Sequence, residues 1–404
     1  MATVQCSLDG SDGVVNVGRA TNTLSSLLQL HRLAQTETVM TEIPLANLRD
    51  TQYVGPIGVG TSDDEGPEET VNVVFDTGST NIWIQSELCK SPACINLHRF
   101  NELKSKTFIK SKRSRYLDIL FGTGELRGLI GEDTVSVGPY KVRNQSFAMI
   151  KQEIGKIFKQ IPFEGILGLA FPKMAANGQL PFFDNVMRQN ALGGQNEFSF
   201  YFQPSPGKGS VILFGGVDNR LYDGPIRMFP VVQEYYWAIE VVDFRIGEES
   251  FISIPSFSAR TRGYRQRPSS VNKVIFDTGT TYFAAPSALL TQISRRLPPA
   301  PCVAVAAQPW QYPEIHYLLK DENGGLFDVA VPATEYMLDA GAGQCVLAFM
   351  PIDVPGKYGP AFILGEVFMR HWFTTYDRGD GTPGSAFVGL ARARHDSSWS
   401  LHSL

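Results

Sequence analysis

The pattern of apolar and polar positions from residue 41 onward is typical of β-structure. Short stretches of alternating or continuously apolar residues are separated by Gly, Pro, Asn and Asp, as between Phe198 and Gly216. Such stretches end in turn-forming residues and are short enough to be strands. Two brief segments, 24–33 and 181–187, look helical instead. We therefore expect an all-β dominated fold with a few short helices.

One short motif occurs twice in the chain. Residues 73–80 read Val-Val-Phe-Asp-Thr-Gly-Ser-Thr, and residues 274–281 read Val-Ile-Phe-Asp-Thr-Gly-Thr-Thr. Each copy is followed, roughly 90 residues later, by Ile-Leu-Gly, at 166–168 and at 363–365. The length of 404 residues is sufficient for two lobes with separate cores. The matched spacing indicates a duplicated β lobe.

The repeated motif places one carboxylate in each half. A single Asp-Thr-Gly is compatible with an ordinary turn that closes a strand, but both halves would have to acquire the same flanks independently. Two carboxylates held a few ångström apart cannot both ionise, so they share one proton. One can then activate a water molecule while the other polarises an amide carbonyl. The motifs identify Asp76 and Asp277 as a candidate catalytic pair.

Other kinds of chemistry find less support in the sequence. None of the six histidines occurs in a His-Glu-x-x-His pattern, no Gly-x-Ser-x-Gly elbow is present, and 207–210 lacks the spacing of a phosphate loop. We expect no metal site and no cofactor. The net charge of −4 does not suit nucleic acid, and no apolar run approaches the ~20 residues that span a bilayer. We expect neither a nucleic-acid partner nor a membrane span.

At these motifs the chain resembles the pepsin-like aspartic proteases, from about Pro44 to about Ala393. Further matches to that family are the segments 53–60, 81–84, 122–124 and 377–378. Within the family the chain is most similar to the maturase-type aspartyl proteases of apicomplexan parasites, the group of the Toxoplasma-type aspartyl protease three and plasmepsins nine and ten. This narrower resemblance rests mainly on Phe121 and on loop lengths.

The resemblance implies a bilobal pepsin-like fold with the active-site cleft between the lobes. We expect a residual prosegment or N-terminal extension at 1–40, an N-terminal lobe with the first catalytic Asp and the flap at 41–225, a C-terminal lobe with the second at 226–393, and a tail at 394–404. The family is made as a secreted zymogen, so an upstream signal and part of the prosegment are expected to be missing. The segment 24–33 would be a prosegment helix or a surface helix.

The neighbours of the two aspartates have expected roles, for the threonines by the resemblance and for the other residues by their local chemistry. Thr77 and Thr278 would brace the two loops against each other. The following glycines would point N–H groups at the carboxylates and the next residues would offer hydroxyl groups; these are Gly78, Gly279, Ser79 and Thr280. The apolar pairs 166–167 and 363–364 would lie under the loops and keep the carboxylates dry. The flap and substrate-binding residues would be Phe121, Gly122, Thr123, Gly124 and Trp83.

Phe121 departs from the common family pattern, in which a tyrosine precedes the flap glycine and bonds to a tryptophan that matches Trp83. Phenylalanine keeps the ring and loses a hydrogen bond of roughly 0.5–1.5 kcal/mol. We expect a flap that opens more easily and a more apolar pocket beside Trp83. The alternative is a neutral exchange in which ring packing supplies the contact.

The implied function is that of an aspartic endopeptidase that acts through an activated water, with no covalent intermediate. Its partners would be protein or peptide substrates and pepstatin-like or hydroxyethylamine peptidomimetic inhibitors, and we expect a monomer. The narrower resemblance implies a maturase that processes secretory proteins of invasion and egress organelles. Two alternatives stay open: a cathepsin-D-like degradative aspartic protease, and a non-catalytic peptide-binding homologue on the same fold.

The cysteines bear on the cellular compartment. Cys89 and Cys94 flank a small loop that a disulfide could close, Cys302 and Cys345 would bracket a larger one, and both pairings match disulfide positions of the family. Four reduced thiols are the alternative. A possible glycosylation sequon at 144–146 favours the secretory pathway, and we expect an acidic, endosome-like compartment. Cys6 is left without a partner.

A basic insertion at 260–267 precedes the second Asp-Thr-Gly motif. Such a run is typical of a solvated loop. It is also compatible with an exosite for acidic substrate segments or with a processing site, and the sequence leaves the three interpretations open.

Overall fold

The computed structural model describes residues 40–63, 66–67, 69–92, 94–111, 116–121, 124–155, 163–204, 209–252 and 271–395. Several predictions fall outside these ranges and stay predictions: the helix at 24–33, the state of Cys6, the basic insertion at 260–267, and the flap residues Gly122 and Thr123. The described residues form mostly β-strands with a few short helices. The predicted fold class is therefore confirmed at that level.

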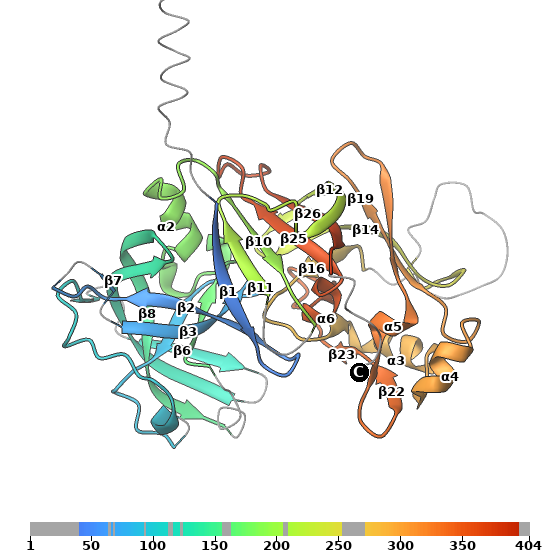
Figure 1. Ribbon diagram of the computed structural model, residues 1–404, viewed down its shortest axis with the longest axis horizontal. Helices are drawn as coiled ribbons and strands as arrows, with labels where there is room; N and C mark the ends of the chain where they lie inside the picture. The colour runs from blue at the N-terminus through green and yellow to red at the C-terminus, as the bar shows by residue number, and fades with distance from the viewer. Residues whose placement is uncertain are drawn as a thin grey trace, which may run out of the picture. The chain divides into compact units, whose positions relative to one another are not determined.

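The largest sheet among the described residues has 14 strands and draws on both ends of the chain (Figure 1). The strands are β1 Thr41–Asn47, β2 Tyr53–Val59, β3 Glu69–Asp76, β4 Ile82–Gln85, β5 Ile109–Lys110, β6 Tyr116–Phe121, β7 Gly124–Val137, β8 Tyr140–Ile154, β9 Gly165–Gly168, β10 Glu197–Tyr201, β11 Ser210–Phe214, β12 Tyr222–Pro230, β25 Trp372–Asp377 and β26 Phe387–Ala393. Their order is β12-β26-β25-β10-β11-β1-β2-β3-β9-β4-β8-β7-β5, with β6 paired to β7. Because β25 pairs with β10, the end of the chain is hydrogen-bonded to its first half.

Within the described residues, the second half of the chain contributes two further sheets. The larger has nine strands in the described residues: β13 Gln233–Glu234, β14 Trp237–Ile246, β15 Glu249–Ser250, β16 Lys273–Phe276, β17 Phe283–Ala285, β19 Ile315–Lys320, β20 Leu326–Val331, β23 Phe349–Pro351 and β24 Phe362–Leu364. The smaller consists of β18 Ala300–Pro301, β22 Gln344–Leu347 and β21 Met337–Asp339.

The helices in the described residues are short. They are the 3-10 helices η1 Cys94–Asn96, η3 Pro172–Met174 and η4 Ala176–Gly178, and the α-helices α2 Phe182–Arg188, α3 Ser287–Arg296, α4 Cys302–Ala307, α5 Ala333–Tyr336 and α6 Glu366–Met369. Helix α2 confirms the helix predicted at 181–187. In the parts of the chain that the structure describes, no helix has the length and apolar character needed to cross a bilayer.

The duplicated motif corresponds to a duplicated strand arrangement. Strand β3, which ends at Asp76, runs parallel to β9 and places Phe75 opposite Leu167. Strand β16, which leads to the second aspartate, runs parallel to β24 and places Phe276 opposite Leu364. All four of these apolar residues are at most 2% exposed. Their continuous apolar runs are explained by burial on both faces of the sheet, which is usual for parallel pairs.

Both predicted disulfides are present. Cys89 is bonded to Cys94 in the segment after β4, and Cys302 at the start of α4 is bonded to Cys345 in β22. Bonds of this kind persist in oxidising compartments and are rare in the cytosol.

Candidate active site

The two Asp-Thr-Gly loops are bound to each other through their threonines. The backbone N–H of Thr77 donates to Oγ1 of Thr278 at 3.0 Å, and the N–H of Thr278 donates to Oγ1 of Thr77 at 3.0 Å. Each hydroxyl also donates to the carbonyl oxygen of a phenylalanine in the other half, Thr77 to Phe276 at 2.9 Å and Thr278 to Phe75 at 2.6 Å. Both threonines are buried. This reciprocal brace joins segments about 200 residues apart and fixes the distance between the loops.

Each aspartate is oriented by donors from its own loop. The backbone N–H of the glycine two residues on donates to Oδ1, at 2.8 Å in both loops, and the hydroxyl three residues on donates to Oδ2. The donors are Gly78 and Ser79 for Asp76, and Gly279 and Thr280 for Asp277. Because two oxygens of each carboxyl group are held, the orientation of both groups is defined by the protein.

The two carboxyl groups lie against the glycine of the opposite loop. A Cβ atom on Gly78 would overlap the carboxyl group of Asp277, and a Cβ on Gly279 would overlap that of Asp76. Only glycine permits this close approach. The structure therefore brings Asp76 and Asp277 together at one site.

Burial and proximity oppose the ionisation of this pair. Asp76 is 7% exposed, and its burial, followed by the negative charge of Asp277, raises its pKa to about 7. Burial likewise raises the pKa of Asp277, although the hydrogen bonds from Thr280 and Gly279 act in the other direction. A pair that loses its last proton only near neutrality holds one proton between two carboxyl groups in mild acid.

The donors around the pair define the chemistry that the site can perform. Within the described residues, no cluster of His, Cys, Asp and Glu side chains is suited to a metal ion. Apart from each other, the two aspartates contact N–H and hydroxyl donors. The arrangement can hold a water molecule against the ionised carboxyl group and a carbonyl oxygen against the protonated one.

The Ile-Leu-Gly segments lie directly behind the two loops. The N–H of Leu169, which follows β9, donates to the carbonyl oxygen of Asp76 at 2.7 Å. In the second half the N–H of Asp277 donates to the carbonyl oxygen of Leu364 at 3.1 Å. Leu167 and Leu364 are completely buried. An apolar layer therefore supports the loops and limits the access of water from behind.

A tyrosine–tryptophan pair beside the site was missed in the sequence. Nε1–H of Trp237 donates to the carbonyl oxygen of Leu169 at 3.0 Å, and its ring packs on Phe171 with centroids 4.6 Å apart. The pKa of the adjacent Tyr236 is raised to about 12, mainly by burial and then by the charges of Tyr235, Asp277 and other neighbours. The run of three aromatic residues at 235–237 was the available signal.

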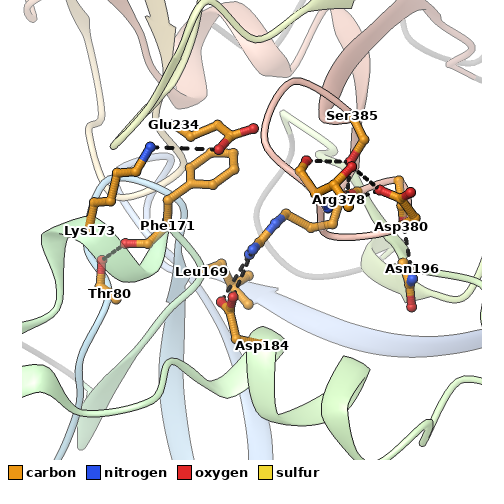
Figure 2. A network of polar contacts seen from close by, with 12 residues as sticks. Thr80, Leu169, Phe171, Lys173, Asp184, Asn196, Glu234, Arg378, Asp380 and Ser385 are labelled. Carbon is orange, nitrogen blue, oxygen red and sulfur yellow. Dashed lines mark hydrogen bonds and ion pairs between the residues drawn. The ribbon is translucent and has the colours of Figure 1, made fainter.

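A buried ion pair also supports the first loop, and its partner was not predicted. Arg378 donates from Nη1 and Nη2 to the two carboxyl oxygens of Asp184 in α2, at 3.0 and 2.7 Å, and its guanidinium lies 4.7 Å from the centroid of the Phe171 ring (Figure 2). Arg378 is 5% exposed. Thr80, just after the first motif, donates to the carbonyl oxygen of Phe171 at 3.3 Å. The bidentate pair thus holds the segment that packs on Trp237.

Glu366 is a third carboxyl group near the site. It begins α6, is 2% exposed, and donates its backbone N–H to the carbonyl oxygen of Thr280 at 2.8 Å. Burial raises the pKa of Glu366 well above its usual range; Arg370 opposes this effect, and the negative charge of Asp277 adds to it. In the sequence, Glu366 is simply the residue after the second Ile-Leu-Gly. Its burial could not be predicted there, because its environment comes from segments distant in the chain.

The predicted flap lies where strands β6 and β7 pair with each other. Strand β6 ends at Phe121 and strand β7 begins at Gly124, and these two residues are paired across the antiparallel ladder. The side chain of Phe121 lies outside the described part of the chain, as do Gly122 and Thr123. Trp83, in β4, is 3% exposed and faces Phe163 with ring centroids 6.1 Å apart.

The role of Phe121 stays a prediction. We expect Phe121→Tyr to preserve the fold, because the ring is retained, and to change the relative affinities of pepstatin and a hydroxyethylamine inhibitor by several-fold. Phe121→Ala should weaken an apolar inhibitor by about tenfold through lost ring contact. Inhibition constants measured for the three proteins at one pH test this. Unchanged constants throughout would mean that the residue does not shape the binding site.

Comparison with known proteins agrees with this geometry. The family model described as eukaryotic aspartyl protease matches residues 52–388. The chain therefore belongs to the eukaryotic aspartyl protease family, as the resemblance at the motifs predicted.

Three relatives define its place more closely. The chain is 38% identical to aspartic protease 3 of Toxoplasma gondii over 369 residues, which cover 90% of this chain and 53% of that protein. It is 34% identical to plasmepsin IX of Plasmodium falciparum over 406 residues, covering 87% and 62% of the two chains. It is also 34% identical to pepsin A of Callithrix jacchus over 376 residues, covering 91% and 89%. The chain thus spans just over half to about three-fifths of the length of the two parasite proteins and most of the length of the pepsin.

Proposed function

We propose that the protein is an aspartic endopeptidase that hydrolyses peptide bonds with a water molecule activated between Asp76 and Asp277. The observation that carries this proposal is the pair of carboxyl groups whose pKa values are both raised and which approach across glycines of opposite loops. The ionised carboxyl group takes a proton from water, and the resulting hydroxide attacks the carbonyl carbon. The protonated carboxyl group donates to the carbonyl oxygen as negative charge develops there.

Collapse of the intermediate completes the reaction. A proton passes from the pair to the amide nitrogen, the C–N bond breaks, and the amine leaves. The pair returns to its singly protonated state, and no bond to the protein forms. The hydrogen bonds from Ser79 and Thr280 keep both groups oriented throughout the cycle.

We propose further that the protein is a maturase that makes limited cuts in secretory proteins of invasion and egress organelles. The resemblance to the maturase-type enzymes supports this role, as does the similarity to aspartic protease 3 and plasmepsin IX. The two disulfides support a secretory location.

A cleavage profile on a peptide library tests both levels of the proposal. We expect cleavage at a restricted set of sequences, blocked by pepstatin. Broad cutting between any two large apolar residues would contradict the maturase role and favour a degradative, cathepsin-D-like enzyme. Binding of pepstatin without cleavage of any peptide from pH 3 to pH 8 would contradict the endopeptidase itself.

Activity is expected to be greatest in mild acid and to fall as pH rises through neutrality. Burial and the charge of Asp277 raise the pKa of Asp76 to about 7, so the shared proton leaves near that pH. At lower pH a second proton neutralises the base. We therefore expect a bell-shaped plot of kcat/KM with an upper apparent pKa near 7 that belongs to the pair. A maximum near pH 2, or full activity at pH 9, would contradict this.

The same shift makes stability depend on pH. The folded protein binds a proton at Asp76 more tightly than the unfolded chain does, so the free energy of unfolding falls as pH rises from the usual carboxyl range to about 7. The expected decrease between pH 4 and pH 7.5 is about 4 kcal/mol. Asp76→Asn should remove most of this dependence. Denaturant unfolding of both proteins across that range measures it, and equal slopes would contradict the assignment.

A further inference from the structure

A hollow of about 640 Å³ includes in its lining Tyr235, the residue before the Tyr236–Trp237 pair, and has no role in the mechanism above. Four segments that are distant in the sequence converge on it. They contribute Lys173 in η3, Val232, Glu234 and Tyr235 around β13, Lys357 and Tyr358 before β24, and a loop between β25 and β26.

The hollow is connected to the first Asp-Thr-Gly loop through contacts between neighbouring residues. Tyr236 contacts Tyr235 and Tyr358 edge to face, with centroids 5.0 and 6.2 Å apart. The next residue, Trp237, donates to the carbonyl oxygen of Leu169, whose own N–H donates to the loop of the first aspartate. Tyr235 and Tyr358 stack on each other at 3.6 Å and form a wall of the hollow. A peptide that passes Tyr236 therefore reaches this wall within a few residues, because an extended chain advances about 3.3 Å per residue.

The charges at the hollow are predominantly positive. Nζ of Lys357 lies 5.1 Å from the centroid of the Tyr358 ring, and Lys357 is exposed. The side chain of Lys173 is 67% exposed, and its ammonium points toward Glu234 at a distance of 3.8 Å (Figure 2). Glu234 is only 16% exposed and already accepts the backbone N–H of Gly384 at 2.6 Å. One oxygen of Glu234 thus accepts from the backbone and the other pairs with Lys173, so two ammonium groups are balanced by one carboxylate and the lining keeps a net positive charge.

We propose that this hollow is an exosite that binds an acidic segment of the substrate, with its carboxylates at Lys173 and Lys357 and its apolar side chains against Tyr235, Tyr358 and the 47% exposed Val232. The proposal rests on the proposed endopeptidase function. The exosite makes the enzyme selective for the residues that flank the scissile bond. The complementary charges of the exosite and the substrate accelerate association. Because its aromatic wall adjoins the site at Tyr236, we expect only one flank of the substrate to reach it.

The test compares peptides with one cleavable core and six-residue extensions on either flank. The extensions alternate Val with Glu, Gln or Lys, and cleavage is measured at pH 5.5, where Glu is ionised and Lys is protonated. In the wild type we expect the Glu extension to raise kcat/KM about fivefold over the Gln extension, on one flank only. This preference should be smaller at 0.5 M salt, because salt screens the charges. The result is the ratio of kcat/KM for two peptides cleaved by the same protein, so a change in the active site that affects both peptides equally does not alter it.

Charge reversal at the hollow should invert the preference. In Lys173→Glu/Lys357→Glu the Lys extension should become the better one. The control Lys90→Glu/Lys110→Glu makes the same change in net charge at two exposed lysines in other parts of the structure and should keep the wild-type ratio. Two results would overturn the exosite. One is a ratio of kcat/KM for the Glu extension to that for the Gln extension within twofold of one on both flanks of the wild type. The other is an unchanged ratio in the charge-reversed variant.

A binding measurement separates this proposal from the proposed function. Fluorescence anisotropy of a fluorescein-labelled Glu-Val peptide, which lacks a cleavable core, needs no catalysis. We expect tighter binding than for the Gln-Val peptide, and loss of the difference in Lys173→Glu/Lys357→Glu. Selective binding by a protein that cleaves no peptide would contradict the endopeptidase function and support the exosite. Cleavage without selective binding would support the endopeptidase function and contradict the exosite.

Discussion

Substitution of asparagine for either Asp76 or Asp277 is expected to lower kcat/KM for peptide cleavage by at least about a thousandfold, with the fold intact. Asparagine has nearly the shape of aspartate and keeps an oxygen for the glycine N–H, so the local hydrogen bond at 2.8 Å can persist in either loop. What it removes is the shared proton, because an amide can neither accept the proton of water nor transfer one to the carbonyl oxygen. Each carboxyl group alone can perform only half of the reaction.

Asp339→Asn provides a matched control. Asp339 is exposed and accepts the backbone N–H of Gly341, two residues on, at 2.7 Å, which is the same local contact that each dyad aspartate makes. Steady-state kinetics with one peptide substrate, together with circular dichroism of all variants, should show activity only in the wild type and the control. Turnover above about a thousandth of the wild-type value in a folded Asp76→Asn or Asp277→Asn protein would contradict the two-carboxylate mechanism.

Gly78→Ala and Gly279→Ala are expected to have the next largest effect, a loss of about a hundredfold or more in kcat. The added methyl group on Gly78 would occupy the position of the Asp277 carboxyl group, and that on Gly279 the position of the Asp76 carboxyl group. One of the loops must then move, although the threonine brace resists movement. A displacement of about 1 Å is sufficient to cost a factor of this size, because the carboxyl groups must both reach the same water and carbonyl.

Gly356→Ala is the control for these two variants. A Cβ atom there meets no heavy atom within 4 Å, so the substitution should leave both kcat and the thermal midpoint nearly unchanged. Crystal structures or pepstatin affinities of the two loop variants would show whether the carboxyl groups have separated. Wild-type kcat in Gly78→Ala would mean that the loops are further apart in solution than these contacts require.

The sequence by itself predicted the candidate site. Asp76 and Asp277 could be singled out because the same motif occurs in both halves of the sequence. In each copy an apolar strand ends in a carboxylate, and a glycine that permits close approach follows two residues later. The same local logic indicated the donors, because a glycine N–H two residues on and a hydroxyl three residues on can reach a carboxylate within one turn. The bond between Cys89 and Cys94 likewise joins residues only five apart, whereas the pairing of Cys302 with Cys345 was predicted from the family resemblance.

Only the tertiary structure decided what surrounds that site. Trp237 donates to Leu169, Arg378 binds Asp184, and Lys173 comes to face Glu234, although each pair is separated by many residues and carries no shared periodicity. The raised pKa of Glu366 arises from burial that no stretch of sequence encodes. Local chemistry is determined by neighbours in the chain, and so it can be predicted from a motif. Burial, charge and long-range contacts depend on which distant segments meet, and that is fixed only when the sheets pack.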